Sequence, residues 1–414
     1  MADLYSTLYK ITLALIIDQT TVQLAPSDIV SIAMIHQYDT ATYPIIRFRI
    51  QTDLSTIQEI NENPDNLQII GNLDASIYKI TQSTDSNTTT IVAPATSISL
   101  QMKGYLENKN IPTSKIDSYQ IGSNTDENAL NASKKITFEM YGYNENMIHQ
   151  MRQHAPSIYR DVSVETVIQD ILNRANIHNA SIDPIENQKR YDQILIPNLS
   201  IIEAFTFFDR FYGLYSHGGL LYGDIDRMYL CNTKSSNNTN TIPIYTHSAK
   251  NNSEDCGMFY VDGQYKMQTN AINVSIISET DVERTLNPEI VSDINVYTLD
   301  SNYEELTKLF DTTNIDSLIN RIDQKNILHK MDRTNVSTQT VARLNEQVTR
   351  IDLSGAGFDV GLFHPNSRFN IIFETPARGL NISDAYRAKY ICHVFSNYSA
   401  NLFQATTTMQ LCTN

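Results

Sequence analysis

One stretch, residues 163–224, constrains the fold more than any other part of the chain, because it contains start and stop signals for several elements. Its first part places apolar residues at helical spacing, the pattern of a helix with one buried face. Ser163 is predicted to begin this helix and Asn176 to end it. The expected buried face consists of Val164, Val167, Ile168, Ile171, Leu172 and Ala175.

A short strand and a second helix are predicted next. The strand covers residues 191–196 and ends at Pro197, since proline has no amide hydrogen to donate to a sheet. Ser200 and Glu203 have the spacing of a capping box, in which each side chain satisfies an otherwise unpaired amide of the first turn. The expected buried face of this helix is Ile201, Ile202, Phe205, Phe208 and Tyr212.

Glycines indicate where the stretch changes direction. Gly213 is predicted to end the second helix in the left-handed conformation. Residues 214–222 are predicted to form a hairpin that turns at Gly218 and Gly219. The predicted order is therefore helix, strand, helix and hairpin, finishing at Asp224.

The segments on either side alternate between apolar and polar residues, which is typical of antiparallel strands. Before the stretch, strands are expected at 9–17, 29–36, 45–50, 67–70, 75–81, 98–105 and 136–143, with a short helix from Asp53, a polar loop at 82–90 and a helix at 145–153. After it, strands are expected near 272–276 and at 358–363, 368–373, 390–395 and 405–411. Helical material is expected at 303–330, and 341–353 fits a helix and a strand equally well.

At 414 residues the chain is too long for one ordinary core. We expect an α+β, β-rich protein of three domains: a β-rich domain at 1–143, a mixed α/β domain at 144–264, and a second β-rich domain with an attached helix at 265–414.

The charge balance argues against a groove that grips nucleic acid. The chain has 46 acidic and 31 basic residues, a net charge of -15, whereas phosphate binding needs clustered Lys and Arg. A channel lined with carboxylates would repel a passing polyanion and keep it from sticking. The acidity therefore permits a role in letting DNA through.

Cysteine spacing and hydropathy predict assembly in the cytosol. The four cysteines form no CxxC pair, so reduced, partly buried thiols are expected. They are Cys231, Cys256, Cys392 and Cys412. The apolar run at 11–17 is closed by Asp18 and reads as a strand rather than a signal peptide. No run is long enough to cross a bilayer, so we expect no stable membrane insertion.

The chain shows no strong catalytic or metal-binding motif. His217, Asp224 and Asp226 are close in sequence, but a turn histidine beside solvated aspartates explains them better than a metal site. Cys392 and His393 lie in a strand pattern that points neighbours to opposite faces, so they cannot act together as nucleophile and base.

Two further patterns favour structural roles. Gly355 and Gly357 begin like a dinucleotide fingerprint, but the third glycine and the following helix are missing. The aromatic residues of 205–215 are expected to fill a core rather than to stack on bases, because Arg210 is the only basic residue among them. We predict no catalytic, cofactor-binding or metal residue and no cofactor. A catalytic carboxylate pair stays open, because its spacing is spatial; Glu203 is the obvious acidic candidate and already has a capping role.

The order of elements in 163–224 also carries a resemblance to a known family. The matching segments are 163–172, 191–192, 199–205, 212–215 and 219–224, together with 366–373 and 389–395 near the end. They resemble the baseplate hub proteins of phage tails, which are related to the spike-base proteins of bacterial type VI secretion. In that family a helix, a strand, a helix ending in a Tyr-Gly pair and a hairpin ending in Asp come in this order.

The resemblance implies two tube-like antiparallel β-barrel domains, at 1–143 and 265–414, flanking the mixed domain. It implies a homotrimer whose six barrels form a pseudo-sixfold ring in the virion tail baseplate, assembled in the host cytoplasm. The tail tube or a tube-initiator protein would lie above the ring, the central spike below and other baseplate proteins around it, with DNA only passing through the lumen. The chain departs from longer relatives in stopping at Asn414, with no peptidase, lysozyme or β-helical spike module after the last expected barrel, so we expect any wall-degrading activity to belong to a partner.

Two alternatives remain open. A tail-associated cell-wall hydrolase would use carboxylates that sequence spacing cannot identify. A receptor-binding tail protein would use its Asn-, Ser- and Thr-rich loops as a contact surface.

Overall fold

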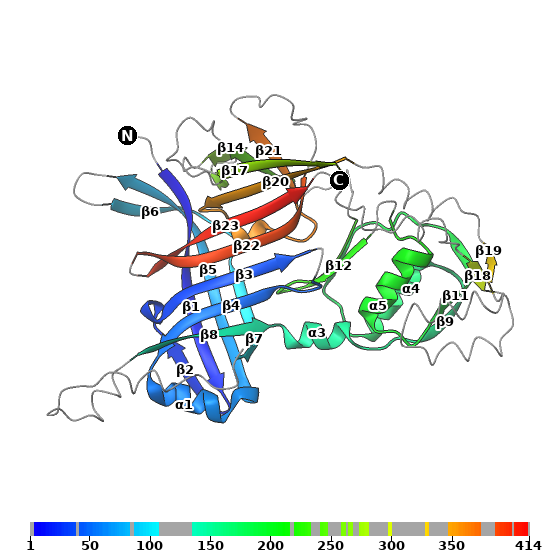
Figure 1. Ribbon diagram of the computed structural model, residues 1–414, viewed down its shortest axis with the longest axis horizontal. Coiled ribbons are helices and arrows are strands. Elements are labelled where there is room, and N and C mark those ends of the chain that lie inside the picture. Colours follow the sequence, from blue (N-terminus) through cyan, green and yellow to red (C-terminus); the bar gives the residue numbers. More distant parts are fainter. Residues whose placement is uncertain are drawn as a thin grey trace.

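The computed structural model in Figure 1 describes most of the chain. The described residues are 4–38, 41–82, 87–106, 135–215, 219–232, 241–246, 258–261, 264–267, 273–280, 297–299, 328–330, 347–373, 386–399 and 401–412. Statements below refer to these residues.

Eight strands hydrogen-bond in a closed cycle, which we call the strand ring. Their order is β22 (Tyr386–Ser399), β3 (Ile29–Gln37), β4 (Ile45–Thr52), β8 (Ile136–Tyr143), β7 (Ile98–Tyr105), β5 (Leu67–Gln82), β1 (Leu4–Ile17) and β23 (Leu402–Cys412). β23 pairs in turn with β22, and every pairing in the cycle is antiparallel. The two ends of the chain thus share one sheet.

Side chains fill the interior of the strand ring. All eight strands contribute to a single apolar cluster, with Tyr9, Phe48, Met140 and Phe395 at no more than 1% exposure. Helix α1 (Leu54–Glu62) closes one end by burying Ile57 and Ile60 in the same cluster. The ring in one chain is therefore a packed core and not an open channel.

Further strands extend or flank this sheet (Figure 1). β2 (Thr20–Leu24) pairs with β1, and β6 (Asn87–Pro94) pairs with β5. β20 (Gln347–Ala356) and β17 (Asn273–Thr280) continue from β23, while β21 (Arg368–Phe373) and β14 (Thr241–Thr246) continue from β22. Two small pairs are separate: β15 (Met258–Val261) with β16 (Gln264–Met267), and β18 (Tyr297–Leu299) with β19 (Leu328–Lys330).

The middle part of the chain has its own core, built mainly on two helices. Helices α4 (Val164–Arg174) and α5 (Ile201–Phe211) pack with α3 (Glu145–Met151) and two small sheets. One sheet is β9 (Ser157–Ser163) with β11 (Arg190–Ile196); the other is β10 (Ala180–Ile182), β13 (Met228–Asn232) and β12 (Gly219–Gly223). The aromatic residues of 205–215 lie in this core, as predicted, except that Phe211 is only partly buried against it.

The helix boundaries predicted from 163–224 are confirmed. The Ser163 side chain accepts a hydrogen bond from the Thr166 amide, and the Ser200–Glu203 capping box is complete. After α4 the chain turns at Asn176, whose φ is 57°, while the Ile177 amide donates to the Leu172 carbonyl. These signals act within one turn of helix, which is why sequence alone reveals them.

Two predictions in the last part of the stretch and beyond it are wrong. The hairpin does not turn at Gly219, which begins β12; the turn instead covers 224–227, and Gly218 lies outside the described residues. Its tip is closed by the Asp224 amide donating to the Arg227 carbonyl at 2.8 Å. Residues 358–363 are not a strand but contain the 3-10 helix η4 (Val360–Leu362). The Leu362 and Phe363 amides donate to carbonyls three residues back, and the Val360 amide donates to the Tyr9 hydroxyl rather than to a neighbouring strand.

The strands predicted at 67–70 and 75–81 form one continuous strand, β5, because residues 67–80 pair with β1 without a break. The polar loop predicted at 82–90 is also wrong in part, since β6 begins at Asn87 in a run of β-branched threonines. Strand β9, which pairs with β11, was not predicted.

For the ambiguous segment 341–353, the described part is strand β20. The helical material predicted at 303–330 is wrong at its end, where residues 328–330 form β19 against β18; residues 303–327 lie outside the described part.

The β-rich α+β fold is confirmed, but two separate barrels are not. β22 and β23, from the predicted third domain, pair with β3 and β1 of the predicted first domain. The boundaries 1–143, 144–264 and 265–414 stay predictions. Cys231, Cys392 and Cys412 are free thiols, and Cys256 lies outside the described residues. Within the described part, none of the helices combines the length and apolarity needed to span a bilayer.

Candidate functional site: the hairpin joint

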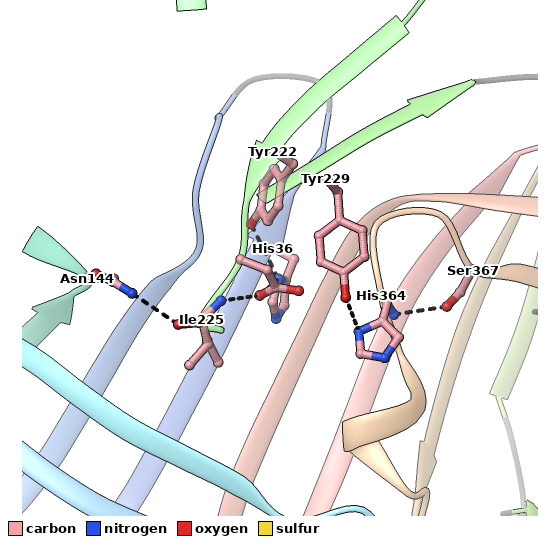
Figure 2. A network of polar contacts seen from close by, with 8 residues as sticks. His36, Asn144, Tyr222, Ile225, Tyr229, His364 and Ser367 are labelled. Atoms are coloured by element: carbon pink, nitrogen blue, oxygen red, sulfur yellow. Dashed lines mark hydrogen bonds and ion pairs between the residues drawn. The ribbon is translucent and has the colours of Figure 1, made fainter. Parts of the chain in front are cut away.

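The turn of the β12–β13 hairpin docks the middle part of the chain onto the strand ring (Figure 2). The Gly223 amide donates to the Thr42 carbonyl at 2.7 Å, and the Asn144 side-chain amide donates to the Ile225 carbonyl at 3.0 Å. We call this contact, with its polar residues His36, Tyr222, Asp224, Tyr229 and His364, the hairpin joint.

Gly223 is required at this joint because the backbone approaches two methionines closely. A Cβ atom there would lie 2.7 Å from Met147 Cγ and 2.8 Å from Met151 Sδ. Helix α3 can therefore pack directly on the strand that enters the turn.

Three side chains form the first half of the joint. The Tyr222 hydroxyl lies 3.3 Å from His36 Nδ1, and Asp224 Oδ1 lies 3.9 Å from the same nitrogen. The Ile225 amide donates to Asp224 Oδ1 at 2.8 Å. Tyr222 and His36 are at most 4% exposed, so the hairpin inserts its polar groups into the interior rather than resting on the surface.

The second half links the hairpin to the segment after η4. The Tyr229 hydroxyl lies 3.1 Å from His364 Nδ1, and the two rings stack with centroids 5.6 Å apart. The His364 backbone amide donates to Ser367 Oγ at 2.9 Å, which holds the backbone that carries the imidazole (Figure 2). The hairpin is thus held at two points, by β3 and by residues near the C-terminal strands.

Aromatic side chains continue from the joint into the strand ring. His36 and His393 have centroids 6.0 Å apart, and Phe363 packs 5.4 Å from His393. His393 Nδ1 and Thr407 Oγ1 lie 2.9 Å apart, within hydrogen-bonding distance. The joint therefore connects the hairpin with β3, β22 and β23 through buried side chains.

Burial controls the charges in the joint. It lowers the pKa of His36 to about 4, so the imidazole is neutral at pH 7 and its contact with Asp224 is not an ion pair there. Burial also raises the pKa of Asp224 to about 6, against the opposing effect of the Ile225 amide. The pKa values of His364 and His393 are lowered, first by burial. At pH 7 the joint holds neutral histidines beside one buried carboxylate.

A cavity of about 370 Å³ lies beside the joint. Its polar lining includes His36, Thr96, Asp224, Asp226, Arg227 and His364. Asp226 is paired with Arg227 at 2.8 Å, and Asp359 accepts hydrogen bonds from the Thr96 amide and hydroxyl.

The joint is a network of hydrogen bonds that holds the hairpin in place. Its hydroxyl, imidazole and amide groups bond to one another across the contact, and the Ser367 hydroxyl bonds to the His364 amide and the Leu362 carbonyl rather than to an imidazole nitrogen. No group of three or more His, Cys, Asp or Glu that could hold a metal ion occurs in the described ranges. The prediction that no residue is catalytic stays a prediction.

The residues singled out from the sequence are not brought together at this joint. Glu203 caps α5, and Cys392 is half-buried on β22 while its neighbour His393 is buried, as the alternation predicted. Asp224 belongs to the joint, Asp226 pairs with Arg227, and His217 lies outside the described residues.

Sequence reasoning missed His36 and His364 because each is a single histidine beside a strand or turn. The available signal was the pair of tyrosines flanking Asp224, at 222 and 229, which share one face of a hairpin once its turn is known. Their partners come from positions 186 and 135 residues away, which no local pattern reveals.

The sequence model of one family, described as Bacteriophage PBS1 gene 109 protein, matches residues 2–411. The chain belongs to this family. The match covers the strand ring, the middle part and the hairpin joint together, and not one segment alone. No curated protein is significantly similar to this family member in sequence.

Among solved structures, the family member is similar to a tail protein from Neisseria meningitidis MC58, with a TM-score of 0.45 and 11% identity over 98% of this chain and 97% of that one. For a 43 kDa tail protein of prophage MuSo2 from Shewanella oneidensis, the TM-score is 0.45 and the sequence identity is 7%, over 97% of this chain and 96% of that one. For a type VI secretion component of E. coli, described as similar to T4 bacteriophage tail proteins, the TM-score is 0.36 and the sequence identity is 8%, over 92% of this chain and 73% of that one. These scores are too low to assign fold or function by themselves.

Proposed function

We propose that this phage family member is a structural protein of the phage tail and serves as its baseplate hub. Three copies would form a pseudo-sixfold ring in the virion, between the tail tube or a tube initiator above and the central spike below, with other baseplate proteins around it. The helix, strand and helix predicted within 163–213 support this role, since their caps and buried faces are present in the structure.

The observation that carries the proposal is the filled strand ring. Because apolar side chains occupy its interior, DNA cannot pass through a single chain, and a channel requires several copies around an axis. Each copy would then form one rigid segment of the channel wall. The net charge of -15 would keep DNA from adhering to such a wall.

A segment of a channel wall must keep its parts in one fixed arrangement, and the hairpin joint meets this requirement. It fastens the middle part to the ring through buried hydrogen bonds, so a force on one part is passed to the other. Buried polar contacts also specify one geometry, because any other arrangement leaves their donors and acceptors unpaired.

Light scattering combined with electron microscopy tests the proposal. The expected result is a mass of three chains and particles with a central opening. Monomers at every concentration, without rings, would contradict it. A peptidoglycan zymogram tests the non-enzymatic assignment: we expect no cleared band, and a band abolished by changing one carboxylate would make the protein a cell-wall hydrolase.

A further inference from the structure

Strand β6 is bonded to the molecule along one edge only. Residues of β6 pair with β5 from Ser76–Pro94 to Gln82–Asn87, and no strand of the described part pairs with the other edge. Figure 1 shows β6 projecting beside the upper ends of β1 and β5, at the outside of the sheet. Its outer backbone amides and carbonyls are therefore open to another strand.

Strand β6 also carries two exposed apolar side chains. Ile91 is 60% exposed and Val92 is 40% exposed. The pairing with β5 shifts register between Ala93 and Ile91, which leaves Val92 as an extra residue in β6. Ala93 packs on the buried Ile77 and anchors the strand to the molecule.

The strand lacks two features that often protect an exposed edge, a charged residue and an inner proline, although its pairing with β5 shifts register at Val92. Its sequence, NTTTIVAP, contains no charged residue, and its proline stands only at the last position. The four central residues are all β-branched, the residue type that strands favour. Native proteins usually place lysine, an inner proline or a bulge on such an edge to stop it from pairing with another chain.

Charge indicates what covers this edge. Two copies of a chain with a net charge of -15 repel each other wherever their acidic surfaces meet. An uncharged strip is the surface at which two such copies can approach with the least repulsion. A strongly basic partner would instead be attracted to the acidic surface and would gain nothing from this strip.

We propose that β6 is the surface through which one copy of the chain binds a second copy, by adding a strand to the sheet at the open edge. The inference rests on the proposed function, which requires copies to meet in a ring. In a closed ring of three, each contact joins two different surfaces, so β6 meets another part of its neighbour and not the neighbour's β6.

The test compares the mass of three purified full-length proteins by light scattering over a range of concentrations. Ile91→Lys combined with Val92→Lys places two positive charges on the open strand. Tyr105→Lys is the matched control, because Tyr105 is 57% exposed but lies on β7, a strand of the ring that pairs with β5 on one edge and with β8 on the other. Circular dichroism checks that all three proteins have the same strand content.

We expect the unchanged protein and the Tyr105→Lys protein to be trimers and the double variant to be a monomer. A trimeric double variant would overturn the β6 contact and leave the proposed hub standing. An unchanged protein that is monomeric at every concentration would overturn both. A dimer that the double variant separates would support the β6 contact and contradict the trimeric hub.

Hydrogen exchange gives a second measurement that needs no variant. The β6 amides of the unchanged protein should exchange more slowly in the oligomer than after dilution to monomer, because an added strand protects them. Equal exchange in the two states would overturn the contact.

Discussion

The hydroxyl of Tyr9 donates a hydrogen bond to the carbonyl oxygen of Phe358 at 2.9 Å, across 349 positions of sequence. The Val360 amide donates to the same hydroxyl at 2.9 Å, and Tyr9 is fully buried. One phenol thus fastens η4, next to the hairpin joint, onto the first strand of the ring.

Tyr9→Phe should therefore destabilise the protein by about 1–3 kcal/mol, because it leaves a buried carbonyl and a buried amide without their partner. The ring contact with Phe395, with centroids 4.9 Å apart, would remain. Urea unfolding followed by circular dichroism measures the loss. Tyr105→Phe, at an exposed position of β7, is the control and should leave the midpoint unchanged.

Asp224→Asn should change how stability depends on pH. The folded-state pKa of Asp224 is raised to about 6 from 3.8, so its contribution to stability is fully present below about pH 3.8 and is lost as pH rises through 6. Above pH 6 the buried charge costs about 3 kcal/mol, which asparagine avoids. The variant should gain stability relative to the unchanged protein between pH 4.5 and 7.5.

The comparison separates the contribution of Asp224 to the pH dependence of stability from that of His36, which has the opposite sign. The pKa of His36 is lowered to about 4, so the folded state loses stability as pH falls below 6.5 in both proteins. Asp226→Asn, at a carboxylate that is 51% exposed and paired with Arg227, is the matched control. The explanation fails if both variants respond to pH alike.

Ser200→Ala should cost about 0.5–2 kcal/mol, because it removes the side chain that caps α5. Ser200 Oγ accepts from the Glu203 amide and donates to the Glu203 carboxylate at 2.7 Å. Ser200→Thr keeps the hydroxyl and should retain most of the stability. Thermal unfolding of the two variants side by side measures the difference; equal losses would show that the cap is not the cause.

Gly71→Ala should disturb the pairing of β1 with β5 and cost about 1–3 kcal/mol. A Cβ atom at Gly71 would lie 2.2 Å from the Thr12 carbonyl oxygen, which belongs to the backbone and cannot rotate away. Gly219→Ala is the control, since its Cβ would come no closer than 3.3 Å, to a Tyr215 ring atom. Urea midpoints should fall clearly for the first variant and little for the second.

Much of the middle part could be predicted because its signals are local. A cap such as Ser200 bonds to an amide three residues away, and the buried face of α4 follows from helical spacing alone. The hairpin was misplaced because Gly218 and Gly219 match a common turn, whereas the observed turn at 224–227 is fixed by its docking on the ring. The joint itself could not be predicted, since His36 and Tyr222 meet only after folding.

By itself the sequence determined many of the strands and helices and the buried faces of α4 and α5, because those properties follow from repeats of two and of about 3.6 residues. Only the tertiary structure decided which strands are neighbours. Alternation identifies the buried face of β22 but not that Tyr390 lies opposite Gln37 of β3, a choice made by the packing of one shared core. That choice closes the strand ring, places η4 against Tyr9 and leaves β6 with an open edge.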